Sequence, residues 1–379
     1  MTPDELAARL QRGDPTAVLD VRNRDEFDTW HIDGQHVTAT QIPAIKFTQA
    51  EVTGTVSDLA DQFRDVPSPV VVACGEGRSS ATVADLLTEA GVEAENLEDG
   101  MEGWARVYRA HEVEHDEATV LQYDRPSSGC LAYMVVGGDE AVVIDPLRAF
   151  ASRYVEDARE RGAELVAAVD THVHADHVSG VRAVAELADV PAVVPVGAVE
   201  RGLDFDARLV EDGDTVSVGN ASLTAVHAPG HTSEMTAYRL GDLLFVGDSL
   251  FLESVARPDL EDGDEGAPDA ARRLYETLRD RYGEFDDEIR VAPGHYSDRA
   301  DPDESGGYVA TLGTLRDRLG ALSMDEAEFV SFVLDDMPPR PANYERIIDA
   351  NLGRDSLDDD EAFEVELGPN NCAATASGE

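Results

Sequence analysis

The stretch Thr171-His172-Val173-His174-Ala175-Asp176-His177 decides how this sequence is interpreted. It places three imidazoles and a carboxylate close together, and these are ligand types that divalent transition metals prefer. Three further candidates, His231, Asp248 and His295, each follow an apolar, strand-like segment. The alternative is a chance cluster of surface or core histidines, but so many ordered ligand types favour a metal site. The predicted metal ligands are His172, His174, Asp176, His177, His231, Asp248 and His295.

The length and composition indicate a folded protein without membrane-spanning segments. A chain of 379 residues can form two or three domains with an ample core. It contains no apolar run long enough to span a bilayer, and residues 1–5 do not resemble a signal peptide, so we expect a soluble, cytoplasmic protein. Its three cysteines, Cys74, Cys130 and Cys372, are too few and too scattered for a disulfide framework.

The charge balance is extreme, with 78 acidic residues against 30 basic ones and Lys46 as the only lysine. A surface this acidic repels nucleic acid and anionic membranes, so neither is expected as a partner. In molar salt the Debye length falls to about 3 Å and the self-repulsion is screened. The composition therefore predicts a halophilic source rather than a merely acidic mesophilic protein.

The pattern of apolar segments predicts an α/β protein with two organisational units. Residues 1–110 alternate short strands with helices, as a small domain with a parallel sheet does. Residues 111–118 are polar and are interpreted as a linker, whereas residues 119–352 combine strand pairs with alternating strands and helices. Residues 353–379 are predicted to form an acidic tail, mobile in its early part, although residues 363–367 alternate as a strand would.

Residues 119–352 resemble the metallo-β-lactamase fold, an αβ/βα sandwich in which two mixed sheets pack between helices and the metal lies at the sheet edges. The resemblance implies a first metal position surrounded by His172, His174 and His231. It also implies a second position, surrounded by Asp176, His177 and His295, with Asp248 between the two. Dizinc thioesterases and mononuclear iron dioxygenases of this fold both keep these ligands. Two zinc ions would provide a hydroxide that attacks a thioester or lactone carbonyl, whereas one Fe(II) would leave positions for a sulfur substrate and O₂.

Three segments away from the ligands resemble the persulfide dioxygenase branch of this fold rather than its glyoxalase II branch. These are Ser128-Gly129-Cys130-Leu131-Ala132-Tyr133, Ala256-Arg257-Pro258-Asp259-Leu260 and Pro338-Pro339-Arg340-Pro341-Ala342-Asn343. One departure is Ala256, which stands where many of these dioxygenases have cysteine. The resemblance implies that Arg257 and Asp259 contact the substrate, but an ion pair that braces the loop is an equal alternative. Cys130 lies in an apolar strand and is interpreted as a buried hydrophobic residue rather than a nucleophile.

Residues 1–110 resemble a rhodanese, or sulfurtransferase, domain. The resemblance rests on motifs that occur in the family's order: Leu19-Asp20-Val21-Arg22, Glu26-Phe27, His31-Ile32-Asp33-Gly34, Cys74-Gly75-Glu76-Gly77-Arg78-Ser79-Ser80 and Gly100-Met101-Glu102-Gly103-Trp104. Cys74 ends a strand, and its loop opens onto a helix N-terminus, which favours a thiolate that can carry sulfane sulfur. Cys74, Arg78 and Ser79 are therefore the predicted catalytic residues. Arg78 lies one place earlier than the family's usual arginine, and an inactive docking module is the alternative.

The fusion of these two units predicts a persulfide dioxygenase with coupled sulfurtransferase chemistry. The expected substrates are a low-molecular-weight thiol persulfide and O₂, and the expected cofactor is one Fe(II) per chain, with two zinc ions as the alternative. Thiosulfate or sulfite is expected to react at the rhodanese-like domain, and a homodimer is among the expectations. The alternatives are a dizinc thioester hydrolase of the glyoxalase II kind and a non-catalytic sulfur-trafficking module.

Overall fold

The structure is a computed structural model that describes residues 1–379 except 298, 304, 336, 369–370 and 375–379. The chain divides into two compact units, one formed by Met1–Tyr108 with Arg125–Ser128 and the other by Arg109–Asp124 with Gly129–Glu379. The end of the predicted acidic tail, at 369–370 and 375–379, lies outside the described residues.

The first unit is built on a four-stranded parallel sheet in the order β2-β1-β3-β4. Its strands are β1 Thr16–Asp20, β2 Val37–Gln41, β3 Val70–Ala73 and β4 Ala94–Asn96. Its helices are α1 Pro3–Gln11, α2 Arg24–Thr29, α3 Ala44–Thr53, α4 Val56–Ala60, α5 Arg78–Glu89 and α6 Gly100–Ala105. Leu19 and Val72 of the central strands are fully buried because helices cover both faces of a parallel sheet. The predicted parallel-sheet domain is confirmed.

The second unit contains two mixed sheets. The seven-stranded sheet has the order β11-β10-β9-β8-β7-β6-β5, and the six-stranded sheet has the order β12-β13-β14-β15-β16-β17. The seven strands are β5 Arg109–Val113, β6 Thr119–Arg125, β7 Cys130–Gly137, β8 Glu140–Ile144, β9 Glu164–Val169, β10 Ala192–Pro195 and β11 Arg208–Val210. The six strands are β12 Thr215–Val218, β13 Ala221–His227, β14 Thr236–Leu240, β15 Leu243–Gly247, β16 Arg290–Pro293 and β17 Ala310–Thr311.

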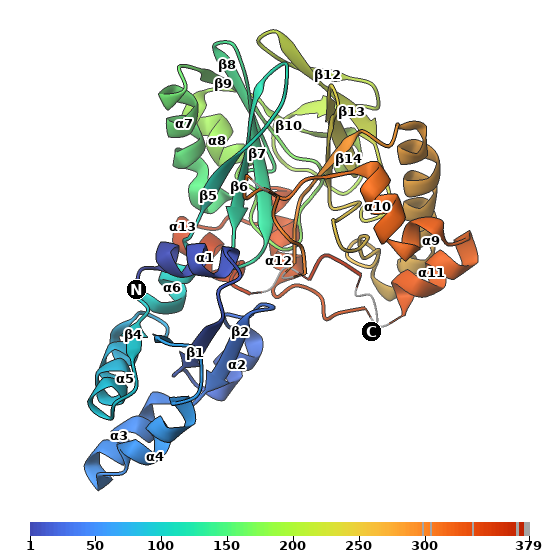
Figure 1. The fold of residues 1–379 in the computed structure, drawn as a ribbon. Coiled ribbons are helices and arrows are strands. Elements are labelled where there is room, and N and C mark those ends of the chain that lie inside the picture. Colours follow the sequence, from blue (N-terminus) through green and yellow to red (C-terminus); the bar gives the residue numbers. More distant parts are fainter. Residues whose placement is uncertain (298, 304, 336, 369–370, 375–379) are drawn as a thin grey trace. The chain divides into compact units, whose positions relative to one another are not determined.

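The core of the second unit lies between its two sheets. Tyr133 of β7 packs against Phe245 of β15 with ring centroids 4.9 Å apart, and both side chains are buried. Figure 1 shows α7 and α8 beside the seven-stranded sheet, and α9, α10 and α11 beside the six-stranded one. The helices are α7 Ala151–Glu160, α8 Val181–Ala188, α9 Gly263–Glu276, α10 Leu312–Arg318, α11 Glu326–Leu334, α12 Tyr344–Asn351 and α13 Asp359–Val365. The predicted sandwich of two mixed sheets between helices is confirmed.

Two segments differ from their sequence-based predictions. Residues 111–113, interpreted as linker, belong to β5, in which Val113 pairs with Val120 of β6. An edge strand tolerates polar residues on its solvent side, so polarity alone did not exclude a strand. Residues 363–365, which alternate as a strand would, lie in α13, whose capping box joins Asp358 and Glu361 and whose Phe363 is buried. The capping box is the local signal for a helix start that outweighs the short alternation.

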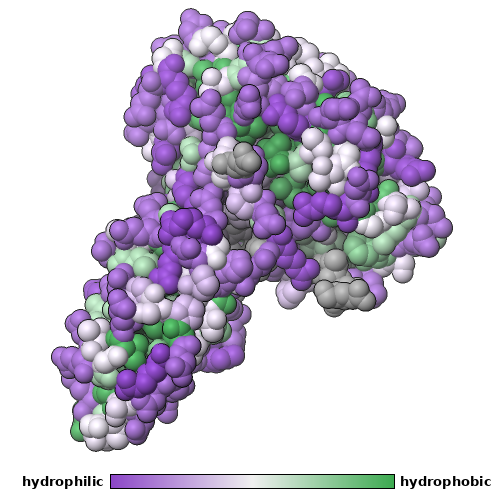
Figure 2. Space-filling view, viewed as in Figure 1, coloured by the Kyte–Doolittle hydropathy of each residue, from purple (hydrophilic) through white to green (hydrophobic). Residues whose placement is uncertain are grey.

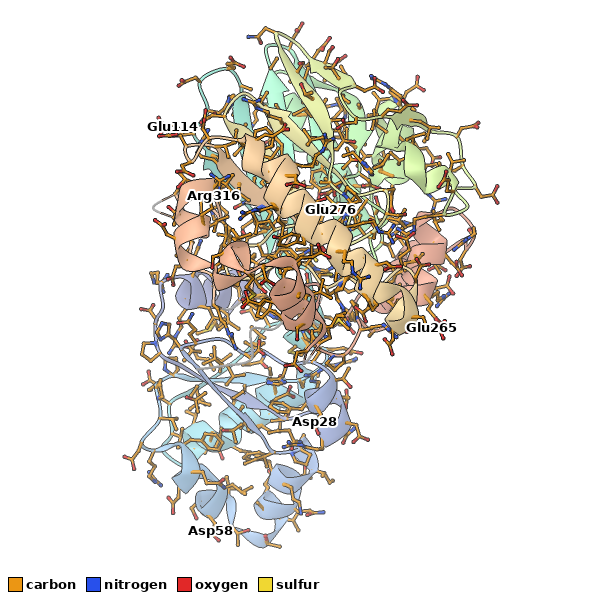
Figure 3. The ribbon with its side chains drawn as sticks, turned by 90° about the vertical axis from the view of Figure 1, so that its right-hand side faces the viewer. Asp28, Asp58, Glu114, Glu265, Glu276 and Arg316 are labelled. Atoms are coloured by element: carbon orange, nitrogen blue, oxygen red, sulfur yellow. The ribbon has the colours of Figure 1, made fainter. Side chains whose placement is uncertain are left out.

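Acidic side chains lie on the surface of both units. Figure 3 labels exposed examples on several elements: Asp28 on α2, Asp58 on α4, Glu114 after β5, and Glu265 and Glu276 on α9. The face drawn in Figure 2 is mostly hydrophilic. The acidic residues are therefore distributed over the fold rather than confined to one tail.

Candidate metal centre and cysteine loop

The predicted metal ligands meet at the ends of several strands of the second unit. His172, His174, Asp176 and His177 lie in the loop after β9, and His231 lies in the loop after β13. Asp248 directly follows β15 and His295 follows β16, and these strands are parallel, so their carboxyl ends meet at one edge. All seven side chains are buried.

Glycines next to the ligands allow this close approach. Gly247 precedes Asp248 with a φ of +48°, and a Cβ there would lie 2.4 Å from Met235 Cε and 2.5 Å from Thr171 Oγ1. A Cβ on Gly294, before His295, would lie 2.4 Å from Asp248 Oδ1. Neither position has room for a side chain, which explains why glycine precedes both ligands.

The first group of ligand atoms consists of His172, His231 and Asp248. The Nε2 atoms of His172 and His231 lie 3.9 Å and 3.7 Å from Asp248 Oδ2. His231 Nδ1 donates to the Arg257 carbonyl at 2.9 Å, so its Nε2 keeps a lone pair for a ligand. These three residues could hold one metal ion.

The orientation of His172 is fixed by a chain of hydrogen bonds. Thr171 Oγ1 donates to Asp145 Oδ2 at 2.9 Å, so it accepts from His172 Nδ1, which lies 2.9 Å away. This assigns the proton to Nδ1 and leaves Nε2 as an acceptor. Burial, with the neighbouring His174 and His231 imidazoles, lowers the pKa of His172 well below its usual value. His172 is therefore neutral, the form that binds metals.

The chemistry of this group fits a bound cation. Within the described part of the chain, His172 Nε2 and Asp248 Oδ2 are buried and have no hydrogen-bond partner. Leaving buried polar atoms unpaired is costly, and a metal ion held between them would compensate both. Two histidines and one carboxylate are also the ligand set of mononuclear non-haem iron sites.

The side chains of the second group form hydrogen bonds mainly with one another; the group consists of Asp176, His177 and His295. His295 bonds through Nδ1 to Asp248 Oδ1 at 2.6 Å and through Nε2 to Asp176 Oδ2 at 2.7 Å. His177 Nδ1 lies 3.1 Å from the same Asp176 oxygen. Burial opposes protonation of His295, but the Asp248 and Asp176 carboxylates outweigh it and raise the pKa of His295 well above its usual value. His295 is therefore expected to be an imidazolium that bridges two carboxylates.

His174 makes contacts through Nε2 outside the first group of ligand atoms. Its Nε2 lies 3.3 Å from Asp145 Oδ1 and 3.8 Å from Asp170 Oδ1, in a separate buried cluster. Its Nδ1 is buried without a hydrogen-bond partner among the described residues, so the placement of His174 with His172 and His231 that the resemblance implies stays a prediction. His174 nevertheless stays close, with its ring centroid 4.2 Å from that of His172.

Two cysteines that sequence reasoning did not assign to the site lie beside it. Cys130 Sγ, at the start of β7, donates to Asp176 Oδ2 at 3.3 Å, and Cys130 bridges to His295 in the sheet. Cys372 has its sulfur close to the ligand atoms of Asp176, Asp248 and His295. The burial predicted for Cys130 is correct, but its neighbours are polar. For Cys372 the sequence offers no signal beyond the presence of a cysteine.

The cysteine loop of the first unit lies between β3 and α5. The Cys74 sulfur accepts from Ser80 N–H at 3.4 Å and from Ser80 Oγ at 3.1 Å, in the first turn of α5. Arg78 pairs with Glu76, and the side chains of Arg78 and Ser79 are exposed. Sequence reasoning therefore missed Ser80, whose position in the first turn of the helix is the signal that could have identified it.

Comparisons with known proteins place both units in families. The metallo-beta-lactamase superfamily matches residues 126–295, and the rhodanese-like domain family matches residues 2–107. The chain thus joins a rhodanese-like domain to a metallo-beta-lactamase domain. Among the residues described, no helix is both long and apolar enough to cross a membrane.

Named relatives of the metallo-beta-lactamase domain fall into two enzyme classes. Persulfide dioxygenase ETHE1, mitochondrial, of Homo sapiens is 29% identical over 215 residues, 56% of this chain and 78% of that protein. A hydroxyacylglutathione hydrolase of Parasynechococcus marenigrum (strain WH8102) is 37% identical over 168 residues, 42% of this chain and 63% of the hydrolase. The domain is therefore related to ETHE1 persulfide dioxygenases at modest identity and also resembles a hydrolase.

Two solved structures are similar to the chain. ETHE1 from Myxococcus xanthus matches with a TM-score of 0.52 and 26% identity, covering 65% of this chain and 98% of that one. A metallo-beta-lactamase from Staphylococcus aureus subsp. aureus COL matches with a TM-score of 0.56 and 28% identity, covering 62% and 74%. The buried histidine and aspartate groups are typical of this fold.

Arg257 and Asp259 of the metallo-beta-lactamase domain form a buried ion pair. Arg257 Nε and Nη2 donate to the two Asp259 oxygens at 2.7 Å and 3.0 Å, and Arg340 Nε also donates to Asp259 at 2.9 Å. Arg257 Nη1 donates to the carbonyls of Pro339 and Asn371. Because the guanidinium is committed to protein acceptors, the geometry favours the bracing role over substrate contact.

Proposed function

We propose that this protein is a persulfide dioxygenase with a coupled sulfurtransferase domain. The reaction converts R–S–SH, O₂ and water to R–SH, sulfite and two protons, where R–SH is a low-molecular-weight thiol. The observation that carries the proposal is the group of His172, His231 and Asp248, in which His172 Nε2 and Asp248 Oδ2 lack hydrogen-bond partners among the described residues. Beside this group lies His295, whose two nitrogens are already bonded. That contrast favours one metal ion over two.

The metal-binding residues of the proposed site are His172, His231 and Asp248. Iron(II) held there would supply the redox chemistry that makes O₂ reactive toward a sulfur anion, with positions left open for both. The protein's own contribution is to fix the ligands: the Arg257 carbonyl orients His231, and Thr171 with Asp145 orients His172. Burial of all three ligands excludes bulk water from the reacting sulfur.

His295 acts as a positioning residue and a proton holder. Its Nδ1 bond to Asp248 Oδ1 turns the other carboxylate oxygen, Oδ2, toward His172 and His231. Its positive charge offsets two buried carboxylates, Asp176 and Asp248, that would otherwise repel an anionic persulfide. Because both nitrogens are engaged, a second metal could bind only after His295 gave up a carboxylate.

Cys74 of the rhodanese-like domain is the proposed carrier of sulfane sulfur. The Ser80 N–H and hydroxyl donate to the Cys74 sulfur, and both would stabilise an anionic sulfur at the start of α5. A Cys74 persulfide could pass its outer sulfur to a thiol, which forms the dioxygenase substrate. It could also pass it to sulfite, which forms thiosulfate and returns the Cys74 thiol.

A dizinc thioester hydrolase is the second candidate function. Within the described residues, His177 Nε2 and Asp176 Oδ1 are also buried without hydrogen-bond partners. They offer two ligand atoms at the second position, as a dizinc site requires. The relation to a hydroxyacylglutathione hydrolase agrees with this alternative.

The deciding experiment measures metal content and two activities on anaerobically purified protein. We expect one iron per chain and oxygen uptake with glutathione persulfide as the probe. The His231→Ala variant should lose metal and oxygen uptake, whereas the matched His227→Ala variant, at an exposed histidine nearby, should keep both. Two zinc ions with thioester hydrolysis and no oxygen uptake would establish the hydrolase instead.

A further inference from the structure

A short C-terminal segment, Asn371–Ala374, returns to the loop that carries Arg257. The Arg257 N–H donates to the Cys372 carbonyl at 3.1 Å, and the Ala374 N–H donates to the Val255 carbonyl at 2.9 Å. Ala256 and Ala373 form an antiparallel bridge. The segment therefore lies along residues 255–257 as a strand would, and we call it the C-terminal strap.

The strap buries the Cys372 thiol at the metal centre. The Cys372 side chain is 1% exposed, and its sulfur and the ligand atoms of Asp176, Asp248 and His295 all lie within 4.8 Å of one another. Asp248 also belongs to the group formed with His172 and His231. The thiol therefore lies next to the proposed iron ligands.

The surroundings of Cys372 differ from those of a packing cysteine. A buried cysteine usually fills apolar space. Here two carboxylates and an imidazole surround the sulfur, and the buried Asp248 Oδ2 and Asp176 Oδ1 lack hydrogen-bond partners among the described residues. A cluster with unpaired ligand atoms and a thiol is arranged for a ligand rather than for packing.

Cys372 and Cys130 are held in different ways. Cys130 lies inside β7, where it bridges to His295 and donates to Asp176. Cys372 lies on the strap, which is attached by backbone hydrogen bonds and by the Arg257 side chain bonded to the Asn371 carbonyl. We infer that detachment of the strap would expose Cys372 to an external sulfur donor, whereas exposure of Cys130 would require the opening of β7.

We propose that Cys372 is a sulfur-carrying residue of the dioxygenase site, so that a persulfide on the protein's own C-terminal strap is a substrate. The proposal rests on the proposed dioxygenase function and specifies its substrate class. The Cys372 sulfur attacks the outer sulfur of an external persulfide, the S–S bond of the donor breaks, and the proton of the Cys372 thiol passes to the departing donor sulfur, so that the donor leaves as a thiol. Cys372–S–SH then reacts with O₂ and water to give Cys372–SH, sulfite and two protons.

The dimensions of a persulfide suit this position. An S–S bond adds about 2 Å to the side chain. Starting from a sulfur within 4.8 Å of an Asp248 carboxylate oxygen, the outer sulfur can approach the group that Asp248 forms with His172 and His231. Docking of the strap would thereby present the sulfane sulfur at the metal ligands.

The test follows one sulfur atom on the full-length metal-loaded protein. The protein is treated with inorganic polysulfide under nitrogen and desalted, and the Cys372 peptide is analysed by mass spectrometry before and after admission of air. We expect Cys372 to gain one sulfur atom under nitrogen and to lose it in air, with release of an equal amount of sulfite. This measurement uses the wild-type chain, so it does not depend on the folding of any variant.

Variants separate the two buried thiols and the metal site. Both variants are made in a Cys74→Ser background, because Cys74 would also take up sulfur from polysulfide. There Cys372→Ser should abolish the sulfite released by desalted protein, whereas in Cys130→Ser the sulfur should still be found on Cys372. The His231→Ala variant should retain the sulfur on Cys372 in air, because without the ligand His231 the protein cannot hold the metal that the oxidation requires.

The possible failures are distinguishable. If Cys372 gains no sulfur under nitrogen, the carrier role is wrong. If Cys372 keeps its sulfur in air while the same sample oxidises added glutathione persulfide, the carrier role is wrong but the dioxygenase function stands. If neither persulfide is oxidised, the dioxygenase function is wrong and the carrier role with it.

Discussion

Replacement of His295 by alanine tests whether the site holds one metal ion or two. The imidazole bonds to Asp248 at 2.6 Å and to Asp176 at 2.7 Å, so its removal frees one oxygen of each buried carboxylate. In the one-metal site His295 only positions a ligand, and loss of such a partner lowers metal affinity about 10- to 100-fold. This corresponds to about 1.4–2.8 kcal/mol of binding free energy.

The two arrangements predict different metal counts for His295→Ala. With one metal, the variant keeps one ion per chain when the metal is in excess and loses it at a lower chelator concentration than the wild type. The metal-free variant should also be less stable by about 3–5 kcal/mol, because two buried carboxylates lose their shared cation.

The assay is metal analysis across a chelator titration, with His231→Ala and the exposed His227→Ala as references. We expect His231→Ala to lose its metal at the lowest chelator concentration and His227→Ala to match the wild type. A wild-type protein with two ions, of which His295→Ala retains one, would refute the one-metal interpretation.

Three further predictions concern the surface, the cysteine loop and the buried ion pair. With a net charge of −48, the protein should unfold in dilute buffer, because at 0.01 M salt the Debye length reaches about 30 Å and the repulsion between its charges is no longer screened. A circular dichroism melting curve that does not change with salt concentration would contradict this. In a colorimetric sulfurtransferase assay, Cys74→Ser should abolish sulfur transfer from thiosulfate to a thiol. Ser80→Ala should slow this transfer about tenfold, because it removes one hydrogen bond to a charged sulfur. Arg257→Met should lower the free energy of unfolding in urea by about 3–5 kcal/mol, because it breaks a buried ion pair. Arg272→Met, which breaks an exposed ion pair, should change it by about 0–1 kcal/mol. Equal effects of the two variants would refute the bracing role.

The sequence was sufficient for the fold class because its strands are strongly apolar and clearly bounded. The run Val70–Ala73, for example, is apolar throughout and forms a buried central strand. The edge strand β5 was missed because half of its surface faces solvent, so its composition matches that of a linker. Helix α13 was missed because a five-residue alternation is too short to distinguish period 2 from period 3.6.

The residues that gather at the candidate metal centre could be predicted from the sequence, but the hydrogen bonds that orient them could not. Which nitrogen of a histidine faces the metal depends on the partner of the other nitrogen. For His172 that partner is Thr171, itself bonded to Asp145, and for His231 it is the Arg257 carbonyl. Asp145 and Arg257 each lie 26 residues from the residue that they contact, and no spacing rule connects them, so only the fold reveals these two contacts.

Arg257 connects a proposed metal ligand, a buried ion pair and the C-terminal strap. Its carbonyl accepts from His231, its N–H donates to Cys372, and its guanidinium bonds to Asp259 and the Asn371 carbonyl. A substrate anion bound by the same guanidinium would have to displace the Asp259 carboxylate, and the strap contact at Asn371 would be disturbed with it. We therefore expect Arg257 to act indirectly, by fixing the proposed ligand His231 and the thiol of Cys372 relative to each other, rather than by binding the substrate.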